Sequence, residues 1–137
     1  INTSKDGEYG FDSCAEHAKS ADLKTLFTQR AVACRQAADE LQACVVQYGG
    51  KPDDSGSVSG AMHRGWVAVR GTLSGYSDQA MLDECERGED TAKARYKEAL
   101  SKALPADVQA IVQRQYDGVL RNHDQIRALR NAGRAQA

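Results

Sequence analysis

The side chains of this sequence best suited to chemistry are four glutamates and a histidine, spread over segments with the pattern of long helices. The acidic residues are densest in the run ECERGED at positions 84–90. Carboxylate oxygens and imidazole nitrogens that project into a helical bundle are the usual ligands of iron and manganese there, and zinc accepts them too. The sequence therefore admits a degenerate mono- or dinuclear metal site, with the candidate ligands Glu8, Glu40, Glu86, Glu89 and His123.

The same carboxylates have a structural interpretation. An unpaired buried carboxylate costs several kcal/mol, so Glu8 and Glu89 could pair with arginines of neighbouring helices. Available partners are Arg30, Arg64 and Arg87. No histidine follows a glutamate by three residues, so the Glu-x-x-His motif of di-iron bundles is absent. We therefore expect no cofactor, and a divalent Fe, Mn or Zn ion is the alternative.

The composition and net charge of the chain limit the kinds of molecule that we expect it to bind. The 137 residues include 18 basic and 19 acidic side chains, with a net charge of -1 and both signs scattered along the chain. No face is built for phosphates or anionic lipid, so nucleic acid and membranes are not expected as partners. No apolar run approaches the roughly 18 residues of a membrane span, and no secretory signal pattern occurs. We expect a cytoplasmic protein.

The sequence also lacks the motifs of nucleophilic and cofactor-dependent enzymes. No Ser/His/Asp set, phosphate loop or dinucleotide fingerprint occurs. The cysteines lie far apart, without a Cys-x-x-Cys pair, and fall among Ala, Val and Leu as reduced core cysteines do. They are Cys14, Cys34, Cys44 and Cys85. These absences favour a protein that is not an enzyme.

The composition predicts an all-α fold, because only two prolines occur, aromatics are 6% and helix-forming residues dominate. Apolar residues at three- and four-residue spacing predict long helices over about 1–19, 22–48, 78–104 and 105–133. Ser20 or Asp22 can cap the second helix, and Ser77 or Asp78 the third. Two antiparallel hairpins joined by a crossover helix over about 56–75 form a ferritin-like four-helix bundle, a single domain over 1–137.

The crossover segment has an unusual polar group of its own. His63, Arg64 and Trp66 come close together there. Such residues can anchor the crossover to a carboxylate of the bundle, or form a subunit interface, where Trp and Arg are enriched. We expect an anchoring or interface role.

Several runs of the sequence resemble one known family. They are DGEYGF (6–11), GSVSGAMHRGW (56–66), ECERGED (84–90), LPAD (104–107) and HDQIRALR (123–130). In these runs the chain is similar to the bacterial family catalogued as domain of unknown function 2383, a ferritin-like four-helix-bundle group. The resemblance implies the bundle, the crossover helix and a cytosolic bacterial protein, and it brings no activity.

Two functions from different classes follow from these observations. The first is a non-enzymatic bundle that associates with itself, as a homo-oligomer, or with a protein partner. A part in stress response is implied only by likeness to the wider ferritin-like proteins. The second is a metal-binding or metal-dependent redox protein that uses the five candidate ligands. The missing Glu-x-x-His motif favours the first.

Overall fold

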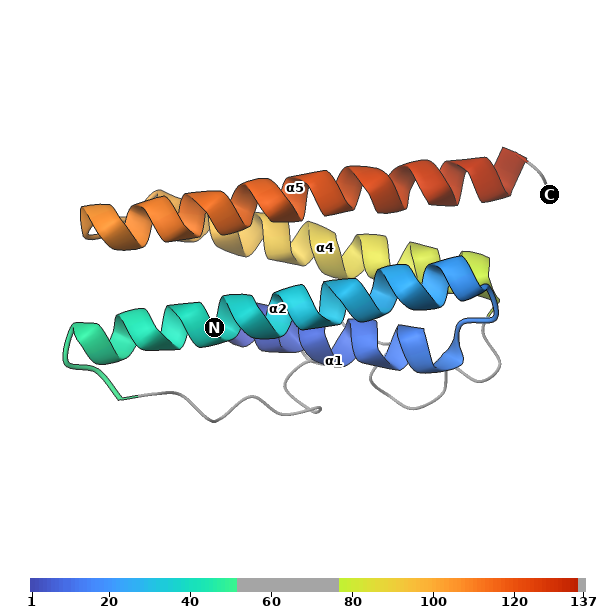
Figure 1. Ribbon diagram of the computed structural model, residues 1–137. Helices are drawn as coiled ribbons and strands as arrows, with labels where there is room; N and C mark the ends of the chain where they lie inside the picture. Colours follow the sequence, from blue (N-terminus) through green and yellow to red (C-terminus); the bar gives the residue numbers. More distant parts are fainter. Residues whose placement is uncertain (52–76, 136–137) are drawn as a thin grey trace.

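The computed structural model describes residues 1–51 and 77–135, and these form four long helices. They are α1 (Asn2–His17), α2 (Ala21–Gln47), α4 (Asp78–Leu100) and α5 (Ala106–Ala135). Figure 1 shows the four helices side by side, with α1 and α2 forming one hairpin and α4 and α5 the other. The predicted all-α four-helix bundle is confirmed. The predicted crossover helix lies outside the described residues.

Polar side chains fix where each helix begins. The Ser20 hydroxyl accepts a hydrogen bond from the Leu23 amide, and the Ser77 hydroxyl accepts one from the Ala80 amide. Both bonds satisfy amides that a helix start leaves unpaired. At the other end of α2, Gly49 has φ +83, a left-handed conformation that glycine adopts without strain. The predicted caps of α2 and α4 are confirmed.

The end of α4 differs from the prediction. The helix stops at Leu100, four residues before the predicted end at 104. The Ser101 hydroxyl donates to the carbonyl of Glu98, which competes with continuation of the helix. Pro105 also disfavours a helical backbone at Leu104. Residues 101–105 therefore form the corner between α4 and α5.

Two sets of contacts hold opposite ends of the bundle. Near the α1–α2 corner, the Asp78 carboxylate accepts from the backbone amides of Lys19 and Ser20, at 2.8 and 2.9 Å. At the far end, the Tyr48 hydroxyl donates to Asp107 at 2.7 Å. The end of α2 and the start of α4 thus lie at opposite ends of the bundle (Figure 1), as the predicted long connection between the hairpins requires.

The main core cluster draws on all four helices. Its fully buried side chains include Phe11, Phe27, Met81, Cys85 and Ile126. Gly7 lets α1 approach α2 closely, because a Cβ there would lie 2.7 Å from Sγ of Cys34. None of the described helices has an apolar stretch long enough to cross a bilayer.

Candidate functional site

The structure brings two acidic residues of α4 next to a histidine of α5. Glu86 and Asp90 lie four residues apart, which places them on one face of α4. Nε2 of His123 is 2.7 Å from Oδ1 of Asp90 and 3.9 Å from Oε1 of Glu86. One ligand atom from each of the three side chains lies within 4.8 Å of the other two. We call these three residues the Glu86–Asp90–His123 group.

His123 is almost completely buried, with 1% of its side chain exposed. Neither ring nitrogen makes a hydrogen bond with the described residues. Both nitrogens nevertheless lie in ion-pair range of carboxylates, Nε2 of Asp90 and Nδ1 of Asp124, the latter at 3.7 Å. Buried imidazole nitrogens normally have hydrogen-bond partners, and this ring has only carboxylate contacts among the described residues.

Two arginines of α5 compete for Glu86. Nε of Arg127 lies 3.4 Å from Oε1 of Glu86, and Arg130 forms an ion pair with Oε2. The Arg127 side chain is about half exposed, whereas Glu86 is buried. Glu86 is therefore neutralised by protein groups already. A cation that enters the group must compete with these guanidinium groups, and the exposed Arg127 is the one with room to move away.

Glu89 lies one turn beyond Glu86 and has separate partners. Its Oε1 accepts a 2.7 Å hydrogen bond from Asn122 and a 3.5 Å contact from Arg30 of α2. Burial raises the pKa of Glu89, and the Arg30 charge opposes that rise. The sequence-based pairing of Glu89 with Arg30 is thus observed. Arg87, a second predicted partner, pairs with Glu84.

The remaining predicted ligands lie outside the Glu86–Asp90–His123 group. Glu40 on α2 is bonded to Arg114 and Gln115 of α5. Burial raises its pKa, but these two partners outweigh it and hold the pKa below the ordinary value. Glu8 on α1 is partly exposed; burial, and then the charge of Asp12, raise its pKa. The structure therefore brings together Glu86 and His123 of the five predicted ligands. The residues predicted to anchor the crossover or form an interface, His63, Arg64 and Trp66, lie outside the described residues.

Asp90 belongs to the group, although it was not among the five predicted ligands. Its side chain is 57% exposed, and it lies off the apolar seam of α4. The signal that could have found it is the Glu-x-x-x-Asp spacing of 86 and 90, which sets two carboxylates one turn apart. The apolar periodicity of the sequence favoured Glu86 and Glu89, which lie beside the apolar seam of α4, as candidate ligands over the exposed Asp90.

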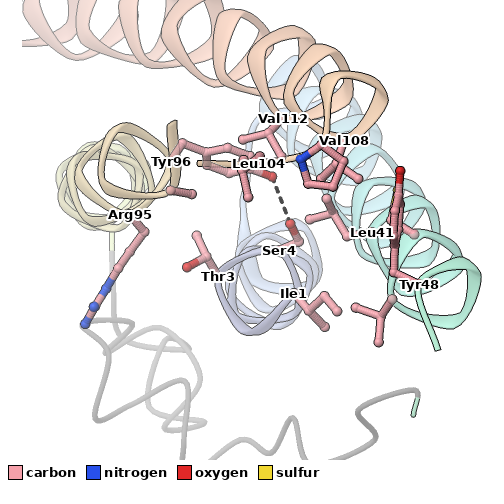
Figure 2. Close-up of a pocket in the computed structure, with 14 residues that line it drawn as sticks. Ile1, Thr3, Ser4, Leu41, Tyr48, Arg95, Tyr96, Leu104, Val108 and Val112 are labelled. Carbon is pink, nitrogen blue, oxygen red and sulfur yellow. Dashed lines mark hydrogen bonds between the residues drawn. The ribbon is translucent and has the colours of Figure 1, made fainter. Parts of the chain in front are cut away.

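A separate apolar cavity lies at the far end of the bundle, beside the first turn of α1. Figure 2 shows Ile1, Leu41, Tyr96, Val108 and Val112 around it, with Tyr48 at its side. Its volume is about 450 Å³. The Ser4 and Tyr96 hydroxyls share a 3.0 Å hydrogen bond in its wall. Apolar side chains dominate its lining, to which Cys44, Arg95 and two tyrosines also contribute.

Comparison with known protein families assigns the chain to a family whose function is unknown. The family model described as "Domain of unknown function (DUF2383)" matches residues 1–102. No curated protein matches the chain. The matched region contains Glu86, Asp90 and the whole acidic run, whereas His123 lies beyond it.

Proposed function

Because the chain belongs to the DUF2383 family, whose function is unknown, we propose from the geometry of its own side chains that it binds a divalent transition-metal ion. The ligands are Glu86, Asp90 and His123. The observation that carries the proposal is the burial of His123 with its Nε2 facing two carboxylates, those of Asp90 and Glu86, at 2.7 and 3.9 Å.

The donor set fits the ion class. One imidazole nitrogen and two carboxylate oxygens suit zinc, manganese and ferrous iron, and the absence of thiolate ligands disfavours copper(I). The three residues come from only two helices, α4 and α5. The hairpin that these helices form therefore carries all three proposed ligands. A bound ion would supply Lewis-acid or redox chemistry, and the chain's residues hold it.

The arginines make the proposed affinity adjustable. Arg127 and Arg130 place two positive charges at Glu86, and like charges disfavour a second cation nearby. Removing the exposed Arg127 should therefore favour the ion. The effect of removing Arg127 separates a metal site from a structural ion pair. If Glu86 served only to stabilise the fold through its arginine partners, the loss of Arg127 would weaken the fold and would not favour a metal ion.

The first test compares two aspartates of similar exposure. Protein purified without a histidine tag is dialysed against Zn(II), Mn(II) and anaerobic Fe(II), and metal content is measured by mass spectrometry. We expect about one ion per chain for at least one metal, and an affinity about tenfold or more weaker in Asp90→Asn. Asp117→Asn is the control, because Asp117 is exposed and its one hydrogen-bond partner among the described residues is Gln113 of its own helix.

In the same metal-binding assay, Arg127→Gln is expected to change the affinity in the direction opposite to Asp90→Asn. Its affinity for the ion should rise severalfold, since a competing charge leaves Glu86. Metal contents far below one per chain for all three ions would overturn the proposal. Equal affinities of Asp90→Asn and the native chain would also do so.

A second candidate function is association with another copy or with a protein partner, as the sequence suggested. Val46 and Tyr48, near the end of α2, expose 53% and 54% of their surface. Exposed large apolar residues are enriched at interfaces. Sedimentation should then show a dimer or larger species that Val46→Glu weakens, and a strict monomer at micromolar concentration would contradict association.

A further inference from the structure

A second cavity lies in the middle of the bundle and differs in chemistry from the apolar one. All four helices line it, and its volume is about 340 Å³. Small-molecule sites cover roughly 300–1,000 Å³, so the cavity suits a compound of amino-acid size. We call it the central polar cavity.

Small residues on every helix line this space. Gly7 comes from α1, Ala33 and Ala37 from α2, Ala92 from α4 and Gly118 from α5. The α2 and α5 helices also contact each other at few positions. A Cβ built on Gly118 would meet only Arg121, at 3.6 Å. Side chains therefore leave the middle of the bundle unfilled on the side between α2 and α5.

The inner wall of the cavity has a carboxylate with an unused oxygen. Glu89 is 2% exposed, and its Oε1 is occupied by Asn122 and Arg30. Its Oε2 has no hydrogen-bond partner among the described residues. Leaving a buried polar atom unpaired is unfavourable. A ligand with an N–H or O–H group would satisfy this oxygen.

The opening of the cavity has surplus positive charge. Arg114 and Arg121 line the cavity and are exposed, so they mark its contact with solvent. Arg114 is paired with Glu40, and Arg30 with Glu89. Within residues 1–51 and 77–135, Arg121 has no ion-pair or hydrogen-bond partner. One guanidinium is thus free to bind a carboxylate, which it can grip with two parallel hydrogen bonds.

We propose that the central polar cavity binds a small organic carboxylate that has an ammonium or hydroxyl donor next to the acid group. The carboxylate faces Arg121 at the opening, and the donor reaches Oε2 of Glu89 inside. Amino acids and hydroxy acids both have this chemistry. The inference is independent of the metal proposal, because it uses none of the Glu86–Asp90–His123 group.

Three compounds with the same carbon skeleton separate the contribution of the carboxylate to binding from that of the neighbouring donor group. Leucine offers an ammonium donor, leucic acid a hydroxyl donor, and isocaproic acid neither. Each is titrated into chelator-treated protein, and binding is followed through backbone amide shifts of the residues that line the cavity. We expect saturable binding of leucine or leucic acid, at least about tenfold tighter than isocaproic acid, because the acid without a donor leaves Glu89 unpaired. Whichever of leucine and leucic acid binds more tightly shows whether the cavity prefers an ammonium or a hydroxyl donor.

Two variants and a control complete the test. Arg121→Gln should weaken binding about tenfold or more, since the carboxylate loses its charge partner. Gly118→Leu should abolish binding by filling the cavity, and it also replaces a helix glycine by a better helix former. Arg35→Gln is the matched control, because Arg35 is exposed on α2 and does not line the cavity. Absence of saturable binding for all three compounds, or unchanged binding in Gly118→Leu, would overturn the inference.

Discussion

Arg30→Ala is expected to lower the free energy of unfolding by about 3–5 kcal/mol, because it leaves the buried carboxylate of Glu89 without its cationic partner. The Arg30 side chain is only 18% exposed, and it also lies over the Phe11 ring, 5.7 Å from the centroid. Urea denaturation at neutral pH measures the loss. Arg95→Ala is the control: Arg95 and its partner Glu98 are both more than half exposed, so its loss should stay below about 1 kcal/mol.

The same variant should recover part of its stability in acid. Burial raises the pKa of Glu89 above the ordinary value of 4.5, and Arg30 lowers it. Without Arg30 the folded-state pKa rises further. Between the unfolded and folded pKa values the folded state holds more protons, so stability falls as pH rises through that window. Arg30→Ala should therefore be least stable at neutral pH and gain as pH falls toward 4.5. A loss that does not depend on pH would contradict this assignment of the Glu89 charge.

Phe27→Ala is expected to cost about 3–5 kcal/mol, through lost burial and the cavity left behind. Phe27 is fully buried, and its ring centroid lies 6.2 Å from that of Phe11. The pair joins α1 to α2 inside the main core cluster. Thermal or urea unfolding, followed by circular dichroism, gives the change. Val46→Ala on the same helix should change stability by less than about 0.5 kcal/mol, and a comparable loss there would contradict this location of the core.

The helices and their starts could be predicted because their causes are local in sequence. Ser20, Ser77 and Gly49 act within a few residues of the helix ends that they define. The apolar spacing likewise predicted the four long helices, because it is a property of each segment by itself. The end of α4 was missed because the spacing continues beyond Leu100, whereas the Ser101 hydroxyl and Pro105 turn the chain.

The candidate site was only partly predictable, because it depends on how α4 and α5 are rotated and aligned. Sequence spacing places Glu86 near the seam but does not say which residue of α5 faces it. Asp90 is exposed, and only the partner helix brings His123 within 2.7 Å of it. The pairing of Glu89 with an arginine was predictable in kind, since an unpaired buried carboxylate is costly. The central polar cavity was not predictable. Its alanines and glycines leave space, and the sequence does not say whether side chains of neighbouring helices fill that space.

The metal proposal is tested most directly at the His123 ring itself. Long-range nitrogen–proton correlation spectra of labelled protein distinguish the two ring nitrogens, and they can be recorded before and after one equivalent of Zn(II). We predict a large shift of the His123 Nε2 resonance on addition of Zn(II), which Asp90→Asn weakens and Arg127→Gln strengthens. His17, whose Nδ1 bonds to the carbonyl of Ser13, should keep its signals. An unchanged His123 ring in the presence of Zn(II) and of the other two ions would contradict metal binding at this group.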